Sequence, residues 1–160
     1  MPMTPFVMRF RELGEAETRV LYARGMPDLP DGDYAFSESY CDEPGCDCRR
    51  VIINVISSPA NPGHWATINY GWESVDFYTR WLRGDKTLAA QCKGPELDPL
   101  NRQTKYAPVF LEIFESVLKD PLYVERLKRH YQLFKSTVGP VAKPKGLKRT
   151  PPKVRKRQRR

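Results

Sequence analysis

The chain has 160 residues, of which 40% are hydrophobic and 11% aromatic, and this composition is typical of one globular domain rather than a disordered chain. Its formal charge of +8 is unevenly distributed. Residues 139–160 hold ten of the 27 basic side chains and no acid, so residues 1–138 carry 17 basic and 19 acidic side chains, a net charge of −2. The composition therefore excludes a strongly basic folded surface and indicates a basic appendage.

The first residues, Met1 to Arg9, contain no long apolar run, so they predict neither a secretory signal nor a membrane span. We expect a cytoplasmic protein, associated with the nucleoid if its basic end binds DNA, and no membrane partner. In such a reducing compartment structural disulfides are rare, so the four cysteines are expected to be free thiols or metal ligands.

Residues 1–31 are interpreted as a partly irregular N-terminal segment with a short strand over 17–22. Three runs with short connections then predict an antiparallel meander. Over residues 33–40 aromatic side chains alternate with smaller ones, which places Tyr34, Phe36, Glu38 and Tyr40 on one face. Residues 50–57 are rich in β-branched side chains, which favour a buried strand. Residues 64–72 again show the alternating pattern of a strand.

The hydrophobic period then changes to that of helices. Ser74 is a plausible N-cap for a helix that reaches residue 83, and a shorter helix is expected over 87–93. Pro108 suits the first turn of a third helix, which Asp120-Pro121 ends while capping a fourth that runs to Val138. The sequence therefore predicts an α+β domain over residues 32–138, in which the meander packs against a C-terminal helical hairpin.

The most informative motif is a cysteine knuckle between the first two strands of the meander. Cys41, Cys46 and Cys48 fall within eight residues around the Pro44-Gly45 turn. Thiolates this close repel one another unless a cation neutralises them, and Zn²⁺ is the commonest such cation. The knuckle therefore predicts a zinc site, with a redox thiol centre and unliganded packing cysteines as the alternatives.

A closed structural zinc site requires a fourth protein ligand. Cys92, at the predicted end of the short helix, completes the simplest set of four cysteines. His130, on the flank of the apolar stripe of the last helix, is the alternative fourth ligand, and His64 is a weaker one. With three protein ligands the metal would keep an open position that can activate water.

The last 22 residues have no apolar period and are rich in proline and basic side chains, so residues 139–160 are predicted to be disordered. Such a polycation is expected to bind nucleic acid or an acidic protein by contacts to phosphates or carboxylates. The nucleic-acid-binding residues expected are Lys148, Arg149, Lys153, Arg155, Lys156, Arg157, Arg159 and Arg160.

Three strings of the sequence resemble a group of uncharacterised bacterial proteins. They are Tyr-Cys-Asp-Glu-Pro-Gly-Cys-Asp-Cys-Arg-Arg-Val (40–51), Ala-Thr-Ile-Asn-Tyr-Gly-Trp-Glu-Ser (66–74) and Arg-His-Tyr-Gln-Leu-Phe-Lys (129–135). The resemblance covers roughly residues 30–136 and implies a cytoplasmic single-domain protein. It implies no activity and no functional residue, and the basic tail lies outside it.

The sequence favours a non-enzymatic binding module that is stabilised by zinc and attached to a polyanion by its basic tail. The alternative is a metal- or thiol-dependent enzyme that uses the Cys41, Cys46 and Cys48 cluster, and a third reading is an adaptor whose tail serves only solubility. The sequence contains no glycine-rich phosphate loop, no nucleophile elbow and no paired histidine ligands, so no catalytic residue is predicted.

Overall fold

The computed structural model of the chain describes residues 2–57 and 62–140. The elements follow in the order β1 (Met3–Pro5), the 3-10 helix η1 (Phe6–Met8), α1 (Arg11–Glu17), β2 (Arg19–Ala23), β3 (Gly32–Cys41), β4 (Arg50–Ser57), β5 (His64–Gly71), α2 (Val75–Trp81), α3 (Lys86–Lys93), β6 (Glu96–Leu97), α4 (Ala107–Val117) and α5 (Pro121–Ser136). The predicted α+β class is confirmed.

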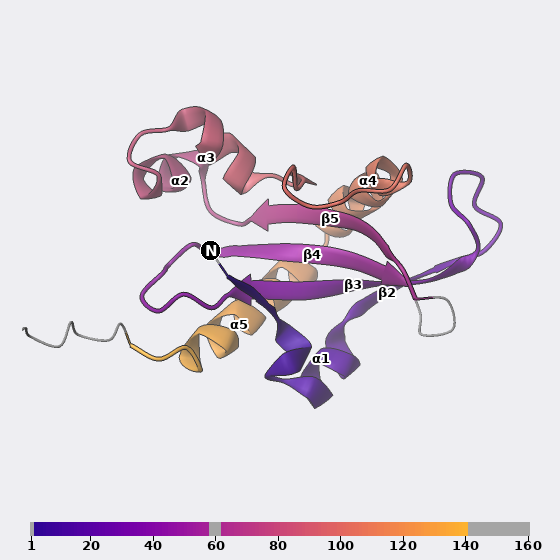
Figure 1. Ribbon diagram of the computed structural model, residues 1–160, viewed down its shortest axis with the longest axis horizontal. Helices are drawn as coiled ribbons and strands as arrows, with labels where there is room; N and C mark the ends of the chain where they lie inside the picture. The colour runs from indigo at the N-terminus through magenta and orange to yellow at the C-terminus, as the bar shows by residue number, and fades with distance from the viewer. Residues whose placement is uncertain (1, 58–61, 141–160) are drawn as a thin grey trace, which may run out of the picture.

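The strands form one antiparallel sheet in the order β1-β3-β4-β5-β6, with β2 also paired to β3. The meander β3-β4-β5 is the predicted one. The N-terminal segment contributes more than the single predicted strand, because β1 pairs with the end of β3 and β2 pairs with its beginning. Between these two strands the chain leaves the sheet as η1 and α1 (Figure 1).

One face of the sheet carries the core. Aromatic side chains at alternate positions of β3 meet the C-terminal helices: Tyr34 packs edge-on against Phe110, Phe36 stacks with Phe114, and Tyr40 contacts Phe134. Helix α4 lies over β5 and β6, and α5 over β3 and β4, so the two helices divide this face between them (Figure 1). Each fully buried large side chain contributes roughly 1.5–3 kcal/mol to folding.

Local signals set the helix boundaries as expected. The Ser74 side chain accepts a hydrogen bond from the backbone N–H of Phe77, and the Asp120 side chain accepts one from Leu122. Helices α2 and α3 form a smaller cluster around Tyr78, Ala89 and Cys92, at the end of the sheet beyond β5 (Figure 1). This pair covers only part of the face opposite α4 and α5.

The predicted disordered tail, residues 139–160, lies outside the described residues apart from Gly139 and Pro140, as do all eight expected nucleic-acid-binding residues. Part of the loop expected between β4 and β5 is also outside them. In the part of the chain that is described, every helix is too short or too polar to cross a lipid bilayer.

The packing of α5 can be tested with two leucines of that helix. Leu127 is fully buried, whereas Leu122 is 76% exposed. Leu127→Asp places an uncompensated carboxyl group in the core and should lower the free energy of unfolding by about 3 kcal/mol or more. Leu122→Asp should change it by less than about 0.5 kcal/mol. Urea unfolding measures both; equal stability of the two variants would contradict the described packing.

Candidate metal centre

The three cysteines of the knuckle converge. The Sγ atoms of Cys41, Cys46 and Cys48 all lie within 4.8 Å of one another. Cys41 ends β3 and Cys48 precedes β4, and both are fully buried, whereas Cys46 in the loop between them is partly exposed. The sulfur atoms are therefore arranged as three ligands of one metal ion, with access from the Cys46 side.

A tight turn brings the third cysteine back toward the other two. The backbone N–H of Cys46 donates to the carbonyl of Glu43 at 3.2 Å, which closes a four-residue turn with Pro44 and Gly45 at its centre. Gly45 has a φ of 76°, in the left-handed region that favours glycine. Proline followed by glycine in this conformation defines a type II turn, so the bend expected from the sequence is present.

Helix α5 holds the loop from one side. The Lys135 ammonium donates to the carbonyl oxygens of Cys41 (3.2 Å) and Glu43 (3.1 Å). One turn earlier, the Tyr131 hydroxyl donates to Asp47 (3.2 Å) and accepts from the backbone N–H of Arg49 (3.3 Å). These bonds satisfy backbone groups of a loop that has no strand partner there.

The N-terminal segment and α2 hold the other sides of the loop. Thr4 of β1 and Arg9 donate to the Asp42 carboxylate at 2.8 and 2.6 Å. Tyr78 of α2 donates to the carbonyl of Arg49 at 2.8 Å. Arg49 itself has a φ of 46°, which a non-glycine residue rarely adopts. The loop conformation is thus imposed by the surrounding elements, as a pre-organised ligand site requires.

The surroundings of the cluster raise the pKa values of two of its thiols. Burial, together with the neighbouring thiols Cys46 and Cys41, raises the pKa of Cys48 to about 12. Burial and the hydrogen bond with Cys41 also raise the pKa of Cys46. Without a cation these thiols stay protonated at neutral pH and are poor nucleophiles. A divalent metal ion supplies the positive charge that stabilises three thiolates together.

Cys92 does not join this group in the described part of the chain. It is buried with Tyr78 and Ala89 between α2 and α3, which is the environment of a small core residue. The predicted set of four cysteines is therefore not assembled as a single cluster. His64 is also elsewhere, with Nε2 at 2.7 Å from the Thr67 hydroxyl.

His130 is not available as the alternative fourth ligand, because both ring nitrogens are occupied. Nδ1 lies 2.7 Å from the Glu38 carboxylate and Nε2 lies 2.5 Å from the Glu17 carboxylate. Phe6 stacks on the ring at 4.2 Å between centroids, and Tyr40 donates to the same oxygen of Glu38 at 2.7 Å. The histidine thus joins α5 to β3 and α1. One signal of this was present in the sequence: Glu38 shares its face with aromatic residues, and a buried carboxylate there needs a partner.

The nearby carboxylates also have other partners. Asp42 is paired with Arg9, and Asp47 accepts three hydrogen bonds from Arg49 and one from Tyr131. Among the described histidine, cysteine, aspartate and glutamate residues, only the three knuckle cysteines come together as a metal-binding group. The residues that position the loop were missed by sequence reasoning, since they lie on β1, α2 and α5, far from it along the chain.

No protein-family model, curated protein or solved structure matches this chain.

The His130 cluster leads to a testable pH dependence. Burial raises the pKa of Glu17, but the hydrogen bonds from His130 and Arg129 outweigh it, so the pKa lies below its ordinary value of 4.5. A depressed folded-state pKa stabilises the protein above pH 4.5, and this contribution is lost as the pH falls through the folded pKa. Glu17→Gln should therefore be less stable than the parent at pH 7, and the difference should shrink below pH 4.5.

Glu12→Gln, at an exposed position of the same helix, is the matched control and should track the parent at every pH. Thermal unfolding between pH 3 and 7 measures all three proteins. A stability difference for Glu17→Gln that stays constant over this range would contradict the assignment.

Proposed function

We propose that the protein is a zinc-stabilised, non-enzymatic binding module. The observation that carries this proposal is the convergence of three buried or partly buried thiols within 4.8 Å at a loop that β1, α2 and α5 hold in place. Thiolate sulfur favours zinc among the common divalent cations, and tetrahedral zinc accepts three cysteines with a fourth ligand from water or a bound molecule.

A role in stability fits the position of the loop better than a role in catalysis. The loop connects β3 and β4, the first two strands of the meander, and its cysteines belong to the main core. In the described residues no histidine, aspartate or glutamate shares the cluster, so it lacks a general base for metal-bound water. The raised thiol pKa values also disfavour a cysteine nucleophile.

The basic end of the chain supplies the binding part of the proposal. Ten positive charges without an acid follow a domain whose net charge is −2, so attraction to a polyanion resides in residues 139–160. Nucleic acid is the polyanion that Lys and Arg side chains contact most generally, through phosphates and without sequence readout. An acidic protein would be recognised by the same charges.

Metal content tests the first part of the proposal. Protein purified without added metal should contain about one zinc ion per chain, and a chelator should lower its melting temperature, since structural zinc adds its binding free energy to folding. Cys46→Ala should lose the zinc. Cys92→Ala should keep the zinc, although Cys92 is more deeply buried than Cys46. Elemental analysis and native mass spectrometry measure the metal.

Two results would overturn the zinc centre. One is metal-free protein whose melting temperature is unchanged in chelator. The other is loss of zinc from Cys92→Ala but not from Cys46→Ala, which would place the site between α2 and α3.

Binding of DNA and RNA as a function of salt tests the second part. Each phosphate that the tail neutralises should contribute roughly −0.7 to −0.9 to the slope of log K against log salt. A chain that ends at Val138 should keep its zinc and melting temperature and lose this binding. If it binds as tightly as the full chain, the attachment surface lies in the folded domain, and the proposed role of the tail is wrong.

A further inference from the structure

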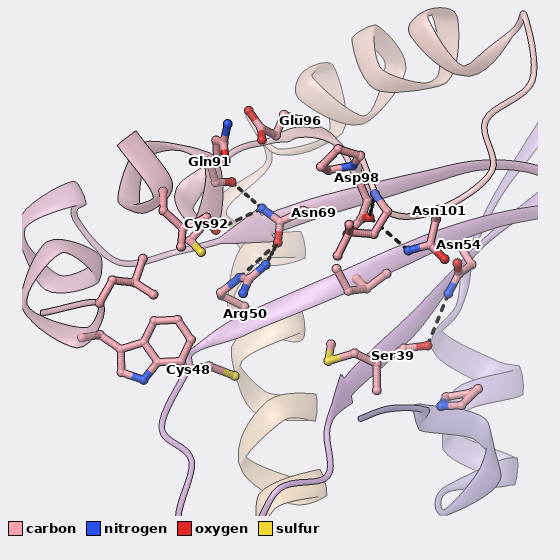
Figure 2. Close-up of a pocket in the computed structure, with 18 residues that line it drawn as sticks. Ser39, Cys48, Arg50, Asn54, Asn69, Gln91, Cys92, Glu96, Asp98 and Asn101 are labelled. Atoms are coloured by element: carbon pink, nitrogen blue, oxygen red, sulfur yellow. Dashed lines mark hydrogen bonds between the residues drawn. The ribbon is translucent and has the colours of Figure 1, made fainter. Parts of the chain in front are cut away.

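A cavity of about 590 Å³ lies on the face of the sheet opposite α4 and α5. Its floor is formed by side chains of β3, β4 and β5, and its rim by α2, α3 and the segment that follows β6 (Figure 2). A cavity of this size, largely apolar with a few convergent polar groups, is typical of sites for small molecules.

The floor follows from strand alternation. Val51, Ile53 and Val55 of β4 are buried on the side of the helices, so the residues between them point to the opposite face. Arg50, Ile52 and Asn54 therefore enter the cavity, and Cys48 lines its end next to the metal centre. Ser39 of β3 and Asn69 of β5 extend the floor on either side (Figure 2).

Arg50 is the positively charged group of the cavity, and its position is fixed. Its Nε (3.1 Å) and Nη2 both donate to the side-chain oxygen of Asn69. The Asn69 amide nitrogen in turn donates to the carbonyls of Gln91 (2.6 Å) and Cys92 (3.1 Å) at the end of α3 (Figure 2). Asn69 is 4% exposed, so this chain of bonds is shielded from water.

The charge of Arg50 is not neutralised by the protein. Asn69 is a neutral acceptor, and Arg50 forms no ion pair with any residue in the described ranges. Within the described residues its Nη1 donates no hydrogen bond, so this nitrogen can bind a ligand. The end of the guanidinium formed by Nη1 and Nη2 matches the two oxygens of a carboxylate.

A negative charge lies on the other side of Asn69. Glu96 of β6 is the cross-strand partner of Asn69 and lines the same cavity (Figure 2). Its side-chain carboxylate forms no hydrogen bond or ion pair within the described residues. Burial raises the pKa of Cys92, Arg50 lowers it and Glu96 raises it, so both charges lie within electrostatic range of one thiol. Strands β4 and β6 flank β5, so Arg50 and Glu96 project from strands on either side of Asn69.

Apolar walls stand beside these two charges. Ile52 belongs to the floor, and the walls include Trp81, Leu82 and Leu88 of the α2–α3 region and Leu100 of the segment after β6. Leu88 and Leu100 are exposed, so they present apolar surface at the rim that a ligand side chain would cover.

We propose that this cavity binds a small zwitterion of α-amino-acid chemistry, with Arg50 holding its carboxylate, Glu96 its ammonium group and the apolar walls its side chain. Arg50 and Glu96 supply the opposite charges that the carboxylate and the ammonium group of such a ligand require. The volume also accommodates a dipeptide. The argument for this ligand rests on neither the zinc nor the tail function proposed above, although Cys48 belongs to both the cavity and the metal group.

The charges of the cavity argue against a phosphate ligand. Asp98 adds a second carboxylate to the lining, although its Oδ1 is already engaged by the Leu100 N–H (2.8 Å) and by Asn101 (3.1 Å). One cation beside two acids repels a dianion, whereas a zwitterion places opposite charges where the cavity requires them.

Calorimetry on the full chain with its metal tests the proposal, using L-leucine and L-leucyl-L-leucine as probes and inorganic phosphate as the competing anion. At least one zwitterion should bind, and the better binder distinguishes a free amino acid from a peptide. Its methyl ester and its N-acetyl derivative, which each lack one charge, should bind at least tenfold more weakly. Absence of binding by both probes at millimolar concentration, or equal binding of phosphate, would overturn the proposal.

Substitutions of Arg50 and Glu96 test which charge of the ligand each residue binds. Arg50→Met should weaken binding at least tenfold, whereas Arg80→Met, at an exposed position of α2 outside the cavity lining, should not. Glu96→Gln should weaken binding of the zwitterion but not of its N-acetyl derivative, and Glu112→Gln on α4 is its control. Since Glu96→Gln leaves the Arg50–Asn69 bonds in place, it decides the question even if Arg50→Met does not fold. Unchanged binding by Glu96→Gln contradicts the proposed ammonium site.

Discussion

The docking of α5 on β3 determines both the core and the geometry of the cysteine loop. At the centre of this contact the His130 ring lies between the carboxylates of Glu38 and Glu17, with Phe6 stacked on it. A buried carboxylate and a buried imidazole are each costly without a partner, so the pair strongly favours one register of the helix over its neighbours. Leu127 precedes His130 by about one turn, and Phe134 follows it by about one turn on the same face.

The register of α5 has a direct consequence for the metal centre. Tyr131 and Lys135 lie on the same helix as His130, and they supply the hydrogen bonds to Asp47, Cys41 and Glu43. A rotation of the helix about its axis would therefore release the loop as well as unpack the core. The coupling also acts in reverse, because a metal ion that fixes the loop stabilises the docked position of α5.

Features that depend on neighbouring residues were predictable from the sequence. Alternation located β3 and β5, and a run of β-branched residues located β4. The side chains of Ser74 and Asp120 marked helix starts, and the Pro44-Gly45 turn indicated that the three cysteines converge. In these cases the determining interactions span fewer than ten residues. The α+β class followed because hydrophobic period alone distinguishes strands from helices.

Features that depend on distant residues were not predictable. Glu17 and Glu38 are 113 and 92 positions from His130, so nothing local marked the histidine as part of a carboxylate cluster rather than a metal ligand. The three residues of β1 include a proline and become a strand only through their pairing with β3. Cys92 was separated from the knuckle because α2 and α3 form their own cluster, and one cysteine in a helix carries no signal of which core it joins.

The two faces of the sheet serve different purposes, and Cys48 lies where they meet. On the helix face, the aromatic side chains Tyr34, Phe36 and Tyr40 of β3 are fully buried, and the Tyr40 hydroxyl donates a hydrogen bond to Glu38. On the opposite face, Arg50 and Glu96 form no ion pair within the described residues and lie beside a cavity, an arrangement that a protein selected for stability alone has no reason to retain. Cys48 belongs to the metal group and also lines that cavity. A metal ion held there would fix the end of β4 from which Arg50 projects, so the stability of the loop sets how rigidly the cavity presents its charge.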